Sequence, residues 1–246
     1  MDRPGLQLRL ARALAIGLIA GAVLPWSVAA ADPELTPAGE ATFAPAAPRA
    51  VPSRIDVNLY RPYVVVRQYT GYWCVPASAQ AIVNIANGTS DRTYNTQARF
   101  AWHVNRFNKY TYPTRGNDPR GWARFLDYWL PGELHYLDRS YNSQSAAIAG
   151  IADAIDRSNR PVGIVVDRGT HAWTVLGYRG TVVRGDPTSR VIEGFYVTGP
   201  LHTVRGKIDP WPYRYMPLAD FKLRFTRYHE STRAVVWEGK FVIVSE

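Results

Sequence analysis

A change in hydrophobic periodicity near Pro161 constrains the fold more than any other feature of the chain. Upstream of it, apolar residues recur at helical spacing in four segments, residues 76–87, 93–107, 118–130 and 143–158. Downstream of it, short apolar runs are typical of strands, at residues 162–167, 172–178, 181–184, 191–197 and 234–244. Helices followed by strands predict an α+β domain, with an N-terminal helical half packed on a C-terminal antiparallel sheet.

Local signals at the ends of the predicted helices support this reading. Gly88 follows the first helical segment as a C-terminal stop. Asp118 precedes Pro119, which is the usual order of an N-cap and a first helical residue. Ser143 is a suitable N-cap for the fourth segment. The chain therefore marks where these helices begin and end.

The chain has one cysteine, Cys74. One cysteine excludes an intramolecular disulfide framework and a multi-cysteine zinc or iron–sulfur site. No pair of histidines has metal-ligand spacing, so we expect neither a metal nor a cofactor. The fold must then rest on a hydrophobic core, and a 46% content of hydrophobic residues is enough to form one.

The N-terminus has the pattern of a targeting segment. Three arginines precede an apolar run of about twelve residues, 13–24, which ends before the small residues around Ala30. A run of this length is short of the roughly 20 residues that span a membrane. We therefore expect a signal peptide at 1–31, a Pro/Ala-rich linker at 32–54 and one folded domain at 55–246. The expected location is secreted or associated with the cell envelope.

The positive charge is spread along the chain rather than gathered in runs. Residues 1–30 carry three arginines and one aspartate, so their removal lowers the formal net charge from +9 to +7. Dispersed basic residues are consistent with electrostatic contact with an anionic cell envelope. No nucleic-acid motif accompanies the charge, and we expect no nucleic-acid partner. The expected partner is a peptide or protein substrate, bound by a monomer.

Cys74 lies at the N-terminus of the first predicted helix, two residues before Pro76. The unpaired N–H groups and the positive end of the helix dipole favour a thiolate there. A free cysteine is most often a small buried hydrophobic residue. This position instead suggests a nucleophile, which needs a histidine as its base.

His171 is the best candidate for that base, because it leads the apolar strand 171–178. If this strand turns at Arg179-Gly180, the hairpin register places Asp186 on the same face as His171, as a diagonal neighbour. A carboxylate there would orient the imidazole. Gln68 lies six residues before Cys74, where its amide and the Cys74 backbone N–H could stabilise an oxyanion.

Together these residues resemble the papain-like cysteine peptidases, and specifically the C39-like, bacteriocin-processing type. The resemblance is carried by three motifs, Gln68-x5-Cys74-x-Pro76-Ala77-Ser78, His171-Ala172-Trp173-Thr174-Val175-Leu176-Gly177-Tyr178 and Gly185-Asp186-Pro187. It implies a papain-like architecture with Cys74 as nucleophile, His171 as general base and acid, Asp186 as orienting residue and Gln68 in the oxyanion hole. The chain departs from the family pattern at Val75, where a glycine often follows the nucleophile.

The sequence predicts a thiol hydrolase that cleaves a peptide or amide bond, and it leaves two alternatives open. A transglutaminase-like acyl transferase would use the same Cys–His–Asp chemistry, and His171-Ala172-Trp173 with Asp186 fits its pattern. A non-catalytic envelope-interaction module could also use the scaffold. The dipeptide Asp209-Pro210 repeats Asp186-Pro187, but it is farther along the chain from the expected hairpin. We expect specificity to be set by residues 93–142 and 195–230.

Overall fold

An antiparallel sheet runs through the part of the chain that the structure, a computed structural model, describes. That part comprises residues 51–110, 116–130, 132, 135–201, 209–210, 214–229 and 235–246. The expected signal peptide and the linker up to residue 50 lie outside it. The described residues belong to one compact unit, Pro48–Glu246. The first strand begins at Pro52, so the last three residues of the expected linker are part of the sheet.

The described residues contain five α-helices and seven strands. The helices are α1 (Cys74–Asn87), α2 (Tyr94–Phe107), α3 (Pro119–Trp129), α4 (Gln144–Ser158) and α5 (Leu218–Arg224). The strands are β1 (Pro52–Asn58), β2 (Leu137–Tyr141), β3 (Val162–Val166), β4 (His171–Val183), β5 (Asp186–Thr198), β6 (Arg214–Pro217) and β7 (Phe241–Ser245). The predicted α+β class is confirmed.

The sheet has the strand order β2-β7-β3-β4-β5-β6, and all neighbours are antiparallel. Two strands share one edge of β4. β3 pairs with its first part, His171–Val175, and β1 pairs with its later part, Gly177–Val183. β1 and β2 lie upstream of Pro161, in the part of the chain for which the sequence predicts helices. The sheet therefore includes two strands besides those predicted downstream of Pro161.

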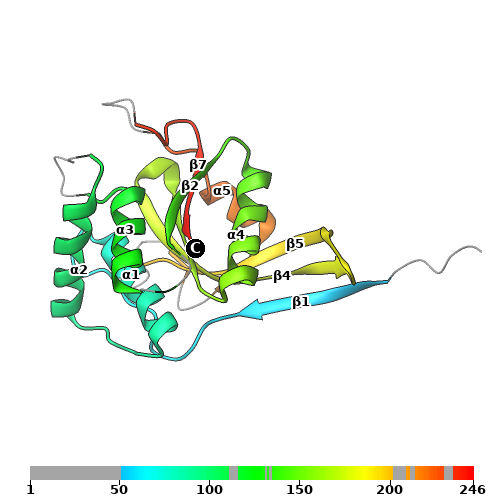
Figure 1. The fold of residues 1–246 in the computed structure, drawn as a ribbon, viewed down its shortest axis with the longest axis horizontal. Coiled ribbons are helices and arrows are strands. Elements are labelled where there is room, and N and C mark those ends of the chain that lie inside the picture. The colour runs from blue at the N-terminus through cyan, green and yellow to red at the C-terminus, as the bar shows by residue number, and fades with distance from the viewer. Residues whose placement is uncertain are drawn as a thin grey trace, which may run out of the picture. The chain divides into compact units, whose positions relative to one another are not determined.

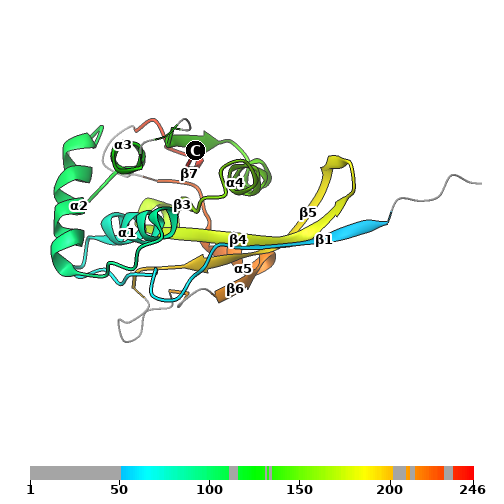
Figure 2. The ribbon, with the colours of Figure 1, turned by 60° about the horizontal axis from the view of Figure 1, so that its bottom comes forward.

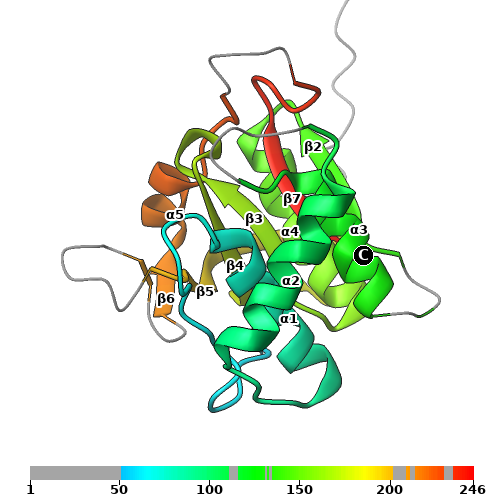
Figure 3. The same ribbon diagram turned by 90° about the vertical axis from the view of Figure 1, so that its left-hand side faces the viewer.

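Helices cover both faces of the sheet. α1, α2 and α3 lie on one side of the strands and α4 and α5 on the other (Figure 1), and Figure 3 shows α1–α3 in front of the sheet. Successive residues of a strand point to opposite faces. Trp173 accordingly joins the core with α4 and α5, whereas its neighbour Ala172 joins the core with α1–α3. Each face of β4 is thus buried.

The predicted helix ends are confirmed. Gly88 adopts the left-handed conformation (φ 70°) as C-cap of α1. Asp118 and Ser143 are the N-caps of α3 and α4, and their side chains accept the N–H groups of Gly121 and Ala146. These boundaries follow from contacts within three residues, which explains why the sequence predicts them well.

The predicted hairpin turn at Arg179-Gly180 is wrong. β4 continues to Val183, and the chain turns at residues 184–185 before β5 (Figure 2). Gly180 lies inside β4 next to a register shift, and a Cβ there would overlap the carbonyl oxygen of Val191. Gly180 therefore marks a close approach of two strands, not a turn. No helix among the described residues is long and apolar enough to cross a membrane.

Gly163 of β3 lies directly against the indole ring of Trp122 on α3, so this contact packs α3 closely on the sheet. A Cβ on Gly163 would overlap the buried Trp122 ring. We expect Gly163→Ala to lower the free energy of unfolding by about 1–3 kcal/mol, because overpacking displaces the ring. Urea unfolding measures this change. Gly71→Ala is the control, since a Cβ at Gly71 meets no atom within 4 Å. Equal stability of the two variants would contradict this packing.

Candidate active site

Cys74 is the first residue of α1, and this end of the helix is open. The first N–H groups of a helix have no partner within it. Trp73, the N-cap residue of α1, has no side-chain oxygen with which to accept them. By contrast, α2, α3 and α4 are each capped by a side-chain oxygen, from Thr93, Asp118 and Ser143. The positive end of α1 is therefore available to a negative charge at Cys74.

Hydrogen bonds between α1 and β4 fix the position of Cys74 relative to His171. The Ser78 hydroxyl donates to the carbonyl oxygen of Ala172 (3.3 Å), and the Thr174 hydroxyl donates to the carbonyl oxygen of Ser78 (3.3 Å). Both bonds are buried. They hold the first turn of the helix against the first residues of the strand. Cys74 lies close enough to His171 to help raise the pKa of the imidazole.

Asp209 completes a chain of three side chains. Its Oδ2 lies 2.7 Å from Nε2 of His171, and its carboxylate is 3% exposed. It also accepts the backbone N–H of Leu201 (2.7 Å) and the indole N–H of Trp173 (3.1 Å). Because Nε2 of His171 is engaged by Asp209, Nδ1 is the ring nitrogen left for Cys74. The three donors fix the carboxylate, and the carboxylate fixes the imidazole.

The pair of His171 and Asp209 shifts the pKa values of both groups. Burial by itself lowers the pKa of His171, but the hydrogen bond and charge of Asp209, together with the interaction with Cys74, outweigh it and raise the pKa to about 9. Burial raises the pKa of Asp209, but the hydrogen bond and charge of His171 and the N–H donors hold it below its usual value. At neutral pH the imidazole is therefore protonated and the carboxylate ionised.

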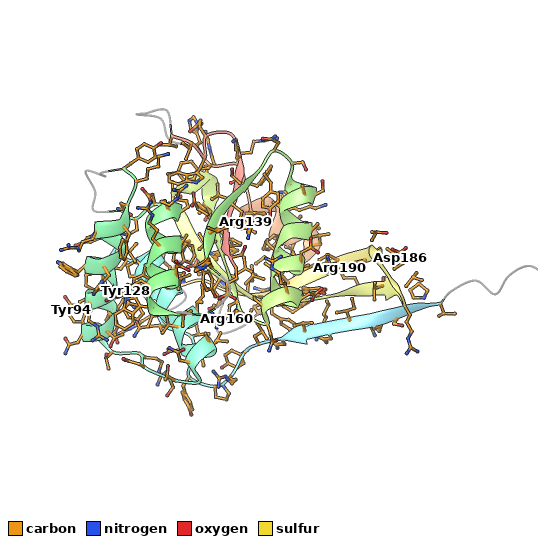
Figure 4. The ribbon with its side chains drawn as sticks, viewed as in Figure 1. Tyr94, Tyr128, Arg139, Arg160, Asp186 and Arg190 are labelled. Atoms are coloured by element: carbon orange, nitrogen blue, oxygen red, sulfur yellow. The ribbon has the colours of Figure 1, made fainter. Side chains whose placement is uncertain are left out.

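Asp186, the orienting residue that the sequence predicts, is not at this site. It lies at the tip of the β4–β5 hairpin, near the start of β1 (Figure 4), where it pairs with Val183 and is exposed. Its carboxylate accepts the hydroxyl and backbone N–H of Thr188. The correction follows from the turn. Because the hairpin is longer than predicted, the partner of Thr174 is Thr198, and the chain after β5 returns to His171.

Asp209 could be recognised in the sequence only as a repeat of the Asp-Pro dipeptide. Its contact with His171 spans 38 residues and depends on the length of the β4–β5 hairpin. Trp173 shows the clearer signal. It shares a strand face with His171, two residues away, and its indole N–H needs an acceptor when the ring is fully buried. A single carboxylate that accepts hydrogen bonds from both the His171 imidazole and the Trp173 indole would meet this need.

Gln68 lies on the segment that leads into α1, and its backbone N–H donates to the carbonyl oxygen of Pro200 (2.9 Å). Its side-chain Nε2 donates to the carbonyl oxygen of Thr70 (2.6 Å), and its buried Oε1 accepts no hydrogen bond in the described structure. Gln68 is not one of the described residues that line the cleft beside Cys74. The second N–H of this amide has no hydrogen bond among the described residues.

A cleft of about 1020 Å³ lies over the three side chains. Cys74, His171 and Asp209 line it, as expected of a reactive centre at the base of a substrate site. Both stretches in which the sequence places specificity contribute to its wall. Residues 93–142 supply Gly116, Asn117, Pro119 and Trp122. Residues 195–230 supply Leu201, Asp209, Arg224, Tyr228 and His229. No cluster of metal-ligating side chains is found among the described residues.

No protein-family model, curated protein or solved structure matches the chain.

The titration of His171 tests the geometry of the site directly. We expect Cys74→Ala to lower the pKa of His171 from about 9, because the variant loses the interaction with Cys74 that helps to raise it. Asp209→Asn should lower it as well. NMR titration of the imidazole measures the change, with Asp186→Asn as the control that leaves it unaltered. An unchanged value in Cys74→Ala would contradict the contact.

Proposed function

We propose that the protein is a thiol hydrolase, a peptidase or amidase, with Cys74 as nucleophile, His171 as general base and acid, and Asp209 as orienting residue. One observation carries the proposal. A cysteine at the open N-terminus of a helix lies near enough to a histidine to raise the pKa of its imidazole, and Nε2 of that imidazole is held by a buried carboxylate, 2.7 Å away. That constellation is what nucleophilic catalysis by a thiolate requires.

The proposed reaction begins when the Cys74 thiolate attacks the carbonyl carbon of the substrate. The carbonyl oxygen takes up the electron pair and becomes an oxyanion. The N–H groups at the uncapped N-terminus of α1, together with the Gln68 amide, stabilise this oxyanion. His171 then gives its proton to the leaving amine as the C–N bond breaks, which leaves a thioester on Cys74. In the second half, His171 removes a proton from water, and the hydroxyl displaces Sγ to release the acid.

A papain-like architecture of the C39-like type is part of the same proposal. It is supported by a nucleophile at the start of a helix that packs on an antiparallel sheet, and by a histidine that begins a central strand of this sheet. The family pattern transfers to Gln68, Cys74 and His171. It does not transfer to Asp186, because Asp209 holds the imidazole instead.

Export is also included in the proposal, on the ground of the expected signal peptide at 1–31. Contact with an anionic cell envelope would follow from the basic charge of the exported chain. The transglutaminase-like alternative shares the thioester and differs only in the group that resolves it. Addition of an amine acceptor to the assay therefore separates hydrolysis from acyl transfer.

Two aspartates form a matched test of the proposed triad. We expect Cys74→Ala to abolish cleavage of a peptide library, and Asp209→Asn to lower kcat/KM by roughly 10²-fold, the low end of what positioned acid–base catalysis contributes. Asp186→Asn should match the wild type, because Asp186 lies exposed at the hairpin tip. Full activity in Cys74→Ala would refute the hydrolase. Loss of activity in Asp186→Asn alone would refute Asp209 as the orienting residue.

The Gln68 amide can be tested as an oxyanion donor. We expect Gln68→Ala to lower kcat by about 10²-fold with little change in KM, because an oxyanion forms only in the transition state. Gln144→Ala is the control, since the Gln144 amide also donates to backbone carbonyl oxygens, those of Lys222 and Phe225, but lies on α4. If both variants lose stability equally and kcat is unchanged, Gln68 only stabilises the turn before α1 through its bond to Thr70, and it is not an oxyanion donor.

A further inference from the structure

The turn between β3 and β4 holds three successive residues at positive φ. They are Asp167 (φ 51°), Arg168 (φ 61°) and Gly169 (φ 93°), and the turn ends two residues before His171. Glycine adopts this conformation freely, but an aspartate and an arginine do so at a cost of roughly 1–2 kcal/mol each. Such strain persists only where the surroundings impose it, and it is concentrated at functional sites.

Contacts from the last residue of α5 and from the segment after it impose this conformation. The Asp167 carboxylate accepts two hydrogen bonds from the Arg224 guanidinium, from Nε (2.7 Å) and Nη2 (2.6 Å). The backbone N–H of Arg168 donates to the Thr226 hydroxyl (2.8 Å), and its carbonyl oxygen accepts the N–H of His229 (3.1 Å). The backbone of Arg168 is thus held on both sides, while its side chain is exposed and lines the cleft.

Arg168 differs from the other charged residues around the cleft. Asp167 is paired with Arg224, His171 with Asp209, and His229 with Glu238. The Arg168 guanidinium forms no salt bridge with any carboxylate of the described residues. A strained turn therefore carries into the cleft a positive charge that no carboxylate of the described residues pairs, three residues from the proposed general base.

We propose that Arg168 determines specificity by binding a carboxylate of the substrate beside the bond that is cleaved. This inference rests on the proposed hydrolase and names its substrate class. A guanidinium binds a carboxylate through two parallel hydrogen bonds, and a side chain fixed at its backbone loses less freedom on binding. The carboxylate can come from an acidic side chain or from the C-terminus of a peptide, and both sources offer the same two oxygens.

The first experiment detects the positive charge in the cleft from the rates at which Cys74 is alkylated, and it does not depend on the proposed hydrolase activity. Iodoacetate and iodoacetamide both alkylate a thiolate, with loss of iodide, but only iodoacetate carries a carboxylate. Because the chain has one cysteine, the labelled site is unambiguous. We compare the rates of the two reagents at Cys74 in the wild type, Arg168→Asn and Arg168→Asp. Asparagine and aspartate tolerate positive φ, so these variants keep the turn.

We expect the ratio of the iodoacetate rate to the iodoacetamide rate to fall roughly tenfold in Arg168→Asn, the size of one charge-assisted hydrogen bond, and further in Arg168→Asp. The loss should lie in the saturation constant of iodoacetate, not in its limiting rate, because Arg168 binds the carboxylate and does not touch Sγ. Arg184→Asn, at the exposed hairpin tip, should keep the wild-type ratio. A wild-type ratio in both Arg168 variants overturns the proposal.

The second experiment tests the substrate class with paired peptides. One pair differs by glutamate or glutamine next to the scissile bond, and the other by a free or amidated C-terminus. We expect a preference for one carboxylate in the wild type that disappears in Arg168→Asn, and the pair that shows it identifies the source. Cleavage without any preference overturns the inference and leaves the hydrolase standing. Absence of cleavage with an altered alkylation ratio refutes the hydrolase and keeps Arg168 as an anion site.

Discussion

The buried contact between His171 and Asp209 is the interaction on which the site depends. A carboxylate that is 3% exposed is costly unless it is paired, and here one imidazole and two N–H donors pair it. The pair draws together the start of β4 and the chain that follows β5. The sign of its effect on stability is set by the raised pKa of His171. On the basic side its contribution is complete at about pH 6.5, the ordinary value for histidine, and is lost as the pH rises through about 9. On the acid side it is lost as the pH falls through the lowered pKa of Asp209.

The helices could be predicted from the sequence because their limits depend on neighbouring residues. Asp118 and Ser143 cap the helices that begin beside them, and Gly88 ends α1 with a positive φ. The sheet was harder to predict, since a glycine in an apolar run fits either a turn or a close approach of strands. Gly180 is the second case, and Gly185 (φ 86°) takes part in the true turn. Local propensity cannot separate them, because the difference lies in the carbonyl oxygen of Val191 across the sheet.

The candidate site shows the same division between local and long-range information. Cys74 and His171 were identified from features of their own segments, a helix start and a strand start. The choice between Asp186 and Asp209 depends on where the β4–β5 hairpin turns, and a shift of a few residues in that turn exchanges one aspartate for the other. The buried indole N–H of Trp173, two residues from His171, calls for a shared acceptor, but either aspartate could meet that requirement until the turn is known.

Departures from locally favourable structure gather at one end of β4. Among the four longer helices, α1 alone begins at a residue that offers no capping oxygen, and Cys74 stands there. The turn before His171 forces Asp167 and Arg168 to positive φ, and His171 itself is charged and nearly buried. Each of these features lowers stability on its own. Their coincidence around one cleft is the pattern expected where a fold gives up stability for the proposed chemistry. The lone cysteine is informative for that reason, because it lies among an open helix end, a protonated imidazole and a guanidinium that pairs with no carboxylate of the described residues.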